Sequence, residues 1–245
     1  TAAINLYGAT LTGGINNSGW IQSGPIPSES KGVIEIKHSR LDGGILNTGT
    51  IYSGTDMNAW GNSGYLYSGQ GVLISRSTIT GGIGNAGLIQ SDSYNGMLLV
   101  GSSVAGSINN SGTILGWTAG IAIYQSSVSG GIINSGWIQG RGQNPGSQLY
   151  GIQVSGSQIA GGINNSGTIV GAGKVGIQAQ NSRINGFINT GVIIGDTAGV
   201  KLEDTVIAGG IYNAGTILGL SEVGLNVLNS KLDRIANAGA IVGIS

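Results

Sequence analysis

Apolar residues recur at fixed positions along the whole chain, separated by Gly, Asn, Ser and Thr. In one copy of the pattern the apolar residues are Ile152, Val154, Ile159, Ile163 and Ile169. Alternation with a period of two residues is typical of a β-strand, whereas an amphipathic helix needs apolar residues three and four apart over a longer stretch. A glycine inside a helix would also cost about 1 kcal/mol. The pattern therefore predicts short strands joined by tight turns.

The motif Asn-x-Gly marks a repeat that covers the chain. Nine copies of the repeat align on this motif, most often 24 or 25 residues after the previous copy, with three longer steps of 30, 38 and 31 residues. The asparagines are Asn17, Asn47, Asn85, Asn110, Asn134, Asn165, Asn189, Asn213 and Asn237. The residue four positions after each of them is always Ile, and a Ser or Thr usually stands about eight positions before. Such self-similarity at a fixed period is the signature of a repeat architecture.

One copy of this repeat cannot bury its apolar residues alone, but stacked copies can, with equivalent residues about 4.8 Å apart. We therefore expect an all-β fold, a right-handed parallel β-helix (solenoid) of about nine coils of a roughly 24-residue repeat, with three short strands per coil. The right-handed sense follows the general preference of parallel crossovers. The chain is expected to form a single β-helix domain over residues 1–245.

The Asn and Gly of the motif are interpreted as structural. Asn tolerates left-handed backbone angles in turns, and a stacked column of Asn can bond amide to amide along the axis. The Gly two residues later is expected to take a positive φ or to let the chain bend without a Cβ. The repeat thus predicts a structural asparagine ladder through all nine copies.

Composition narrows the possible partners. Charged residues are 8% of the chain, against about 25% in typical proteins, and ten basic residues balance ten acidic ones. This offers no electrostatic footprint for nucleic acid or an anionic membrane. The absence of cysteine removes disulfides and thiol chemistry, and no apolar run is long enough for a membrane-spanning helix. Because the chain starts at Thr1, we expect it to be a processed chain or a segment of a longer protein.

Three insertions fall at the same place in the repeat, at residues 24–32, 54–71 and 140–151. They should emerge along one edge of the solenoid, where loops on a rigid scaffold often carry binding sites. The longest insertion holds aromatic rings beside amides and a carboxylate, and these side chains could stack on a sugar, grip a partner protein, or fold back over their own apolar surface. The candidate binding residues there are Trp60, Tyr65, Tyr67, Asp56 and Asn62.

A second candidate surface lies on the repeat itself. Trp20 and Trp137 share the column three residues after the Asn, which alternates with the buried Ile and should face outward. Beside it, the later copies carry an aliphatic stripe, which either contacts another surface or is covered by flanking sequence. The stripe consists of Val170, Ile194, Leu218 and Val242.

Catalysis has little support in the sequence. His38 is the only histidine, and the ten acidic residues are scattered along the chain. A polysaccharide lyase or hydrolase, the alternative from the enzyme class, needs clustered carboxylates on one face. We therefore expect no enzymatic activity, no catalytic residues, no metal and no cofactor. A flat threonine lattice of the ice-binding type is disfavoured, because the outward column mixes Trp, Thr, Leu, Val and Ala.

The stretches "GGINNSGTIVG" at 161–171 and "GSINNSGTILG" at 106–116 resemble the passenger domains of bacterial autotransporters and related Gram-negative surface adhesins. The similarity covers essentially the whole chain. It implies a protein that is secreted or displayed on the bacterial cell surface, outside the outer membrane, as part of a longer passenger. The implied roles are adhesion, autoaggregation or biofilm formation, with a host-surface or bacterial-surface glycan or protein as partner, or a second copy of the chain. No catalytic residue carries over from the resemblance.

Overall fold

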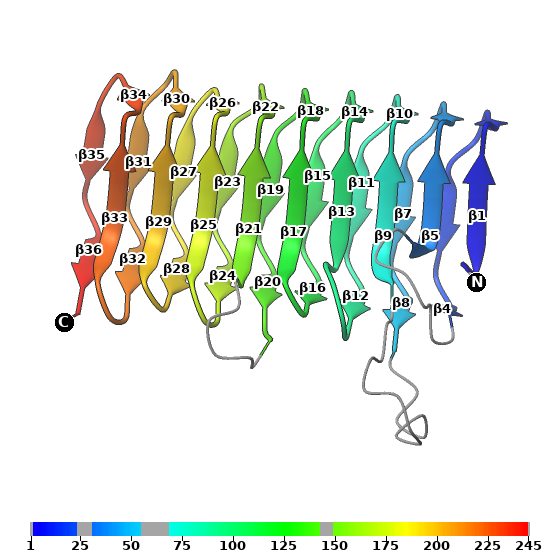
Figure 1. Ribbon diagram of the computed structural model, residues 1–245, viewed down its shortest axis with the longest axis horizontal. Helices are drawn as coiled ribbons and strands as arrows, with labels where there is room; N and C mark the ends of the chain where they lie inside the picture. The colour runs from blue at the N-terminus through cyan, green and yellow to red at the C-terminus, as the bar shows by residue number, and fades with distance from the viewer. Residues whose placement is uncertain (1, 24–30, 55–68, 143–148, 245) are drawn as a thin grey trace.

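The chain winds into a parallel β-solenoid. The computed structural model describes residues 2–23, 31–54, 69–142 and 149–244. Within these residues, 36 strands form nine coils of four strands, and equivalent strands pair in parallel as four stacked sheets of nine strands each (Figure 1). The repeat and the number of coils are confirmed, but each coil has four strands rather than the predicted three.

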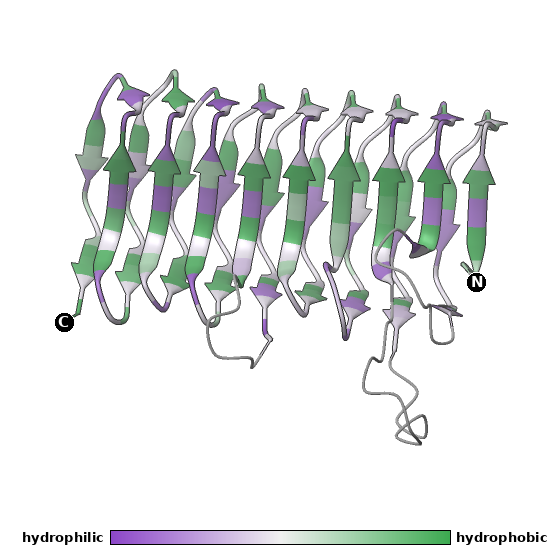
Figure 2. Ribbon diagram, in the orientation of Figure 1, coloured by the Kyte–Doolittle hydropathy of each residue, from purple (hydrophilic) through white to green (hydrophobic). Residues whose placement is uncertain are grey.

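Sheet A holds the longest strands, and most residues of its outer face are buried or half-buried. In Figure 2 hydrophilic bands cross three of its later strands, β25, β29 and β33. The strands of sheet A are β1 (Ile4–Tyr7), β5 (Gly32–Lys37), β9 (Gln70–Ser75), β13 (Met97–Val100), β17 (Ala119–Tyr124), β21 (Tyr150–Ser155), β25 (Val175–Gln180), β29 (Ala198–Glu203) and β33 (Val223–Leu228).

Sheet B accounts for the extra strand in each coil. Each of its strands has two residues, of which one points inward, so no alternation is visible in the sequence and the segment reads as part of a turn. The strands of sheet B are β2 (Thr10–Leu11), β6 (Arg40–Leu41), β10 (Thr78–Ile79), β14 (Ser103–Val104), β18 (Ser127–Val128), β22 (Gln158–Ile159), β26 (Arg183–Ile184), β30 (Val206–Ile207) and β34 (Lys231–Leu232).

Sheet C ends each of its strands on an asparagine of the repeat. Its register is strict: Ile108 pairs with Ile132 and Asn110 with Asn134. The strands of sheet C are β3 (Ile15–Asn17), β7 (Ile45–Asn47), β11 (Ile83–Asn85), β15 (Ile108–Asn110), β19 (Ile132–Asn134), β23 (Ile163–Asn165), β27 (Phe187–Asn189), β31 (Ile211–Asn213) and β35 (Ile235–Asn237).

Sheet D follows the Asn-x-Gly turn and closes the coil. Its strands are β4 (Trp20–Ser23), β8 (Thr50–Ser53), β12 (Leu88–Ser91), β16 (Thr113–Gly116), β20 (Trp137–Gly140), β24 (Thr168–Gly171), β28 (Val192–Gly195), β32 (Thr216–Gly219) and β36 (Ala240–Gly243). The segments 24–30, 55–68 and 143–148, which lie outside the described residues, follow β4, β8 and β20.

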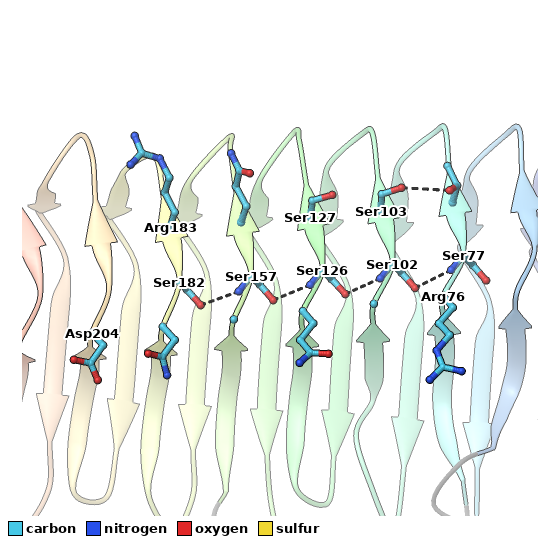
Figure 3. A pocket seen from close by; sticks show the side chains of 16 residues that line it. Arg76, Ser77, Ser102, Ser103, Ser126, Ser127, Ser157, Ser182, Arg183 and Asp204 are labelled. Atoms are coloured by element: carbon cyan, nitrogen blue, oxygen red, sulfur yellow. Dashed lines mark hydrogen bonds between the residues drawn. The ribbon is translucent and has the colours of Figure 1, made fainter.

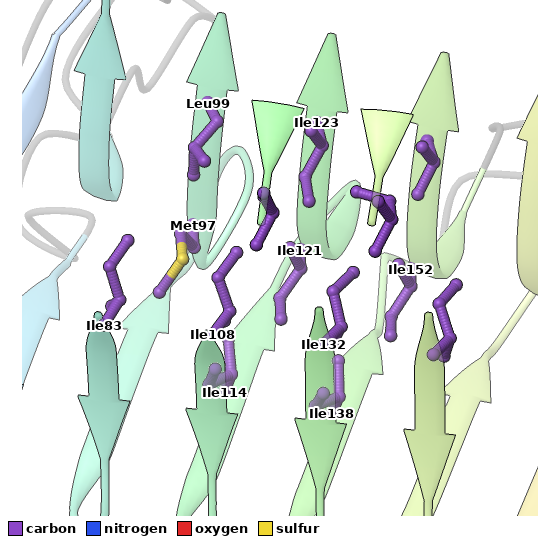
Figure 4. Close-up of a cluster of buried hydrophobic side chains, with 14 of the residues drawn as sticks. Ile83, Met97, Leu99, Ile108, Ile114, Ile121, Ile123, Ile132, Ile138 and Ile152 are labelled. Carbon is purple, nitrogen blue, oxygen red and sulfur yellow. The ribbon is translucent and has the colours of Figure 1, made fainter. Parts of the chain in front are cut away.

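The inward-facing isoleucines form one continuous core that runs along the axis (Figure 4). Burial comes from stacking and not from the single coil. Ile211 is 1% exposed, whereas Ile235, at the equivalent position of the last described coil, is 51% exposed because only one described coil packs against it. The core therefore depends on neighbouring coils, as in other repeat architectures.

The predicted asparagine ladder is confirmed and runs through all nine coils. Each Asn donates from Nδ2 to Oδ1 of the Asn in the next coil, with distances of 2.7 to 2.8 Å. The same Nδ2 also donates to two backbone carbonyls, as Asn85 does to Gly87 and Thr113. Asn47 to Asn213 are at most 2% exposed, so the ladder satisfies amides that would be costly to bury unpaired.

The predicted backbone of this turn is wrong in one respect. None of the nine ladder asparagines, and none of the glycines two residues later, has a positive φ. The glycines are needed for close approach between coils, because a Cβ on Gly136 would lie 2.1 Å from the carbonyl oxygen of Gly112. The structure therefore supports the other role predicted for this glycine, which is to let the chain bend without a Cβ.

The left-handed conformation occurs instead at the corner between sheets A and B. The residue two positions before each sheet B strand has a φ of 48° to 60°, and it is Gly in some coils and a polar residue in others. These residues are Gly8, His38, Arg76, Gly101, Gln125, Gly156, Asn181, Asp204 and Asn229. Among the described residues no helix is long and apolar enough to cross a membrane.

Candidate functional site

The predicted binding residues fall into two groups. Trp60, Tyr65, Tyr67, Asp56 and Asn62 lie outside the described residues, so their candidate role as a binding cluster stays a prediction. Trp20 and Trp137 lie in strands β4 and β20 of sheet D, which are the strands that precede two of the three insertions.

Trp20 and Trp137 face outward from sheet D, as predicted, with 64% and 40% of their surface exposed. Each indole is held by a glutamine two residues further along the same strand. The Trp20 Nε1 donates to the Gln22 Oε1 at 2.9 Å, and the Trp137 Nε1 donates to the Gln139 Oε1 at 3.0 Å. The two coils thus repeat one local arrangement, a ring fixed in orientation beside an amide.

A polar cluster that the sequence did not reveal lies next to these rings. Asp92 accepts hydrogen bonds from the Tyr52 hydroxyl at 2.6 Å and from the Gln90 Nε2 at 2.8 Å, and it forms an ion pair with Arg141. The tilted rings of Tyr52 and Trp20 lie 6.1 Å apart, which joins the cluster to the first indole. The ion pair connects the third coil to the fifth.

The same carboxylate changes the acidity of the phenol. The pKa of the Tyr52 hydroxyl is raised to about 12, first by its hydrogen bond to Asp92, then by burial and by the negative charge of Asp92, while the positive charge of Arg141 acts in the opposite direction. Deprotonating Tyr52 would break the hydrogen bond and place two negative charges side by side. The phenol therefore stays neutral, as a donor to Asp92, over the whole physiological range.

The outer face of sheet D divides into two parts. Coils one to five carry the tryptophans, Tyr52 and the glutamines, whereas coils six to nine carry the predicted aliphatic stripe. The stripe faces outward, as expected: Val170, Ile194 and Leu218 are half-buried, and Val242 is 40% exposed. We call the first part, made of Trp20, Gln22, Tyr52, Gln90, Asp92, Trp137, Gln139 and Arg141, the aromatic face.

The geometry of the aromatic face suits an extended polar ligand with apolar patches. Four coil steps separate Trp20 from Trp137, or about 19 Å along the axis. An exposed aromatic ring supplies a flat apolar contact, and the amide beside it supplies a donor for a hydroxyl group. The carboxylate in this surface, Asp92, is paired with Arg141 and accepts a hydrogen bond from the Tyr52 phenol.

The single histidine and the Lys201–Glu203 pair lie on other parts of the described solenoid. His38 is exposed at the corner after β5, with its ring 5.5 Å from that of Tyr7 in an edge-on contact. Lys201 and Glu203 form an ion pair at 3.1 Å on the outer face of sheet A. Within the described ranges, no group of three or more His, Asp or Glu is close enough to hold a metal ion.

A second surface feature was not predicted. An open groove of about 910 Å³ runs along the corner between sheets A and B, at the opposite ends of the sheet A strands from sheet D (Figure 3). Its lining comes from positions that differ from coil to coil, so the repeat pattern gives no sign of it. A fixed left-handed residue followed by a buried Ser or Thr is the signal that could have located this corner.

Comparisons with protein-family models, with curated proteins and with solved structures find no match for this chain. The structure itself shows that the chain is a parallel β-solenoid of four stacked sheets with an internal asparagine ladder.

Proposed function

We propose that this protein is a non-catalytic binding protein, in which the solenoid is a rigid support and the aromatic face of sheet D contacts a glycan. The observation that supports this most is the repeated pair of exposed indoles, each hydrogen-bonded to a glutamine on its own strand. A fixed ring loses little freedom on binding, which lowers the cost of association.

The composition of the aromatic face favours a carbohydrate over an apolar partner. Sugars present C–H faces to aromatic rings and hydroxyl groups to amides and carboxylates, and the aromatic face holds both kinds of group. The insertion after β8 follows the strand that carries Tyr52, and we propose that its aromatic residues, Trp60, Tyr65 and Tyr67, contact the same glycan.

The setting we propose is the bacterial cell surface. The resemblance to autotransporter passengers and Gram-negative adhesins, together with the absence of cysteine, supports a secreted protein that adheres to a host-surface or bacterial-surface glycan or protein. We also propose that the coil is right-handed, which is the general preference of parallel crossovers. Adhesion, autoaggregation and biofilm formation are the roles that a long rigid binding surface would serve.

A glycan array with the purified chain tests the proposal. Trp20→Ala and Trp137→Ala should each weaken binding of a neutral glycan that the wild type retains, whereas Thr168→Ala, in the same outward column one coil beyond Trp137, should not. Deletion of residues 54–70 or Trp60→Ala tests the contribution of the long insertion. Unchanged binding in the double variant of Trp20 and Trp137 would contradict a role for the aromatic face.

Self-association through the aliphatic stripe is a second candidate. Outward aliphatic residues on four successive coils are the observation that favours it. Ile194→Lys, with Thr216→Lys as a control on the neighbouring column, should reduce dimer or aggregate formation in sedimentation velocity if the stripe is the contact. The polysaccharide lyase or hydrolase alternative would need a second carboxylate near the one that lines the corner groove, Asp204, and among the described lining residues it is the single acid.

A further inference from the structure

The groove between sheets A and B has a floor that is closed to ligands. The floor is the column of buried serines, in which the backbone N–H of each serine donates to the hydroxyl of the next coil, as Ser102 does to Ser126 at 3.0 Å. The same hydroxyl donates to a backbone carbonyl two residues earlier, as Ser126 does to Tyr124 at 2.7 Å. Figure 3 shows this chain of bonds from Ser77 to Ser182. The floor is therefore a rigid, fully bonded track.

The walls of the groove are open to ligands. One wall is the left-handed column and the other is the first position of each sheet B strand. The amide side chains of Gln125, Gln158 and Asn181 and the guanidinium groups of Arg76 and Arg183 line these walls and form no hydrogen bond or ion pair with other described residues. Donors and acceptors are thus available on both sides of the track.

Side-chain size alternates along the wall that is formed by the residues with left-handed backbone angles. Long polar side chains at Arg76, Gln125 and Asn181 alternate with Gly101 and Gly156 in the coils between them. A Cβ added at Gly101 would meet only the Arg76 Cγ, at 3.6 Å, so each glycine leaves an open notch. Notches two coils apart are separated by about 9.6 Å, twice the spacing of parallel strands. This distance is close to the length of a disaccharide in an extended glycan.

The charges of the groove favour an anionic ligand. Arg76 and Arg183 stand on opposite walls, four coils apart, and Asp204 lies at one end as the single carboxylate among the described lining residues. A planar guanidinium group that is not engaged elsewhere matches a carboxylate with two parallel hydrogen bonds. A neutral glycan would use the amides and notches but would leave both cations without partners.

We propose that this groove binds an extended acidic glycan, in which sugar rings follow the serine track and uronate carboxylates pair with Arg76 and Arg183. This inference does not rest on the proposed role of the aromatic face, since the two surfaces lie at opposite ends of the sheet A strands (Figure 1). The protein would then hold two separate binding surfaces on one support.

Two probes of matched linkage test the charge requirement. Calorimetric titration of the wild-type chain with a β-1,4-linked mannuronate hexamer should show binding that weakens as salt is added, and the neutral β-1,4-linked mannose hexamer should bind at least about tenfold more weakly. The double variant Arg76→Gln and Arg183→Gln should lose at least about tenfold in affinity for the acidic hexamer. Equal binding of both probes, or no binding of the acidic one at millimolar concentration, would overturn the proposal.

Matched variants locate the site. Arg40→Gln changes an arginine of the same sheet B column that is already paired with Asp42 and lies outside the groove lining, and it should leave the affinity unchanged. Gly101→Gln and Gly156→Gln fill the notches with a residue that the same column already holds at Gln125, and they should reduce affinity without unfolding the chain. Trp20→Ala and Trp137→Ala should leave binding of the acidic hexamer intact. Loss of that binding in the two tryptophan variants, with no effect of the arginine changes, would place the ligand on sheet D and contradict the groove assignment.

Discussion

Two corners of the coil carry ladders of polar side chains, and they differ in what surrounds the ladder. At the corner between sheets C and D the asparagines are the same in all nine coils, and their amides are bonded to one another and to backbone carbonyls. At the corner between sheets A and B the buried hydroxyls are nearly as uniform, but the residues on either side of them change from Arg to Gly to Gln to Asp. We call the first corner closed because its ladder amides are bonded within the stack, whereas the second forms the floor of an open groove.

Within one repeat, the asparagine corner thus stabilises the stack, and the corner between sheets A and B offers side chains for binding. A ladder that uses every donor and acceptor internally stabilises the stack and leaves nothing for a ligand. A ladder flanked by variable, exposed side chains keeps the chain in register while the walls are free to differ. The comparison predicts that changes at the closed corner alter stability, and that changes on the walls of the open corner alter binding alone.

Adding a methyl group at each corner should give the largest contrast. Gly136→Ala places a Cβ 2.1 Å from a backbone oxygen that cannot move without shifting a coil, so we expect a loss of at least about 3 kcal/mol in the free energy of unfolding. Gly101→Ala, at the open corner, meets no backbone atom and should cost about 1 kcal/mol for its left-handed φ. Denaturant unfolding of both variants measures the difference, and equal losses would contradict the comparison.

Removing one member of the asparagine ladder should give the next largest effect. Asn110→Ala deletes the donor to Asn134 Oδ1, which is buried, and removes four hydrogen bonds, three donated by Asn110 and one accepted from Asn85, so we expect a loss of about 2–3 kcal/mol. Asn237→Ala is the matched control at the exposed last coil, where water can replace the lost partner, and it should cost well under half as much. A similar loss in both variants would mean that burial of the ladder does not matter.

Removing one hydroxyl from the open corner should cost less. Ser126→Ala leaves the Ser102 N–H without its acceptor, at a cost of about 1–2 kcal/mol. The wall variants Gln125→Ala and Gln158→Ala, whose side chains form no hydrogen bond with described residues, should leave the free energy of unfolding unchanged. Thermal unfolding of the three proteins checks both statements, and a destabilised wall variant would show that the walls are structural.

The smallest effect concerns alkaline pH. The pKa of Tyr52 is raised from 10.0 to about 12, first by its hydrogen bond to Asp92, and burial raises the pKa of Tyr150 to about 12. Since the folded state holds these protons more tightly, their stabilising contribution is complete below pH 10 and is lost as the pH rises towards 12. Tyr52→Phe should therefore make the stability less dependent on pH in that window, as measured by urea unfolding at several pH values. An identical pH dependence in the variant would contradict the role of the Asp92 hydrogen bond.

The features that repeat could be predicted from the sequence, and those that vary could not. The isoleucine core, the asparagine ladder and the outward direction of Trp20 and Trp137 follow from columns that recur at one period. Sheet B was missed because a two-residue strand has no alternation. The left-handed column was missed because Arg76 and Gln125 occupy it in some coils, although neither is typical of that conformation.

The two candidate surfaces differ in the same way. The indoles of the aromatic face stand out in the sequence as large residues in a column of mostly small ones. Their outward position could therefore be predicted from the sequence. The Asp92 cluster and the groove depend on residues from different coils that are far apart in sequence, such as Arg141 and Asp92. The spacing of these residues in the sequence does not predict that they lie together. A register for the whole solenoid is needed before these residues can be placed together.

The side-chain amides of the two corners can be compared in one nitrogen-15 NMR experiment on hydrogen exchange. The account predicts slow exchange for the Nδ2 protons of the buried ladder, such as those of Asn110 and Asn134, and exchange at the rate of free amides for Gln125, Gln158 and Asn181. Ladder amides that exchange as fast as the groove amides would contradict the claim that one corner is closed and the other open.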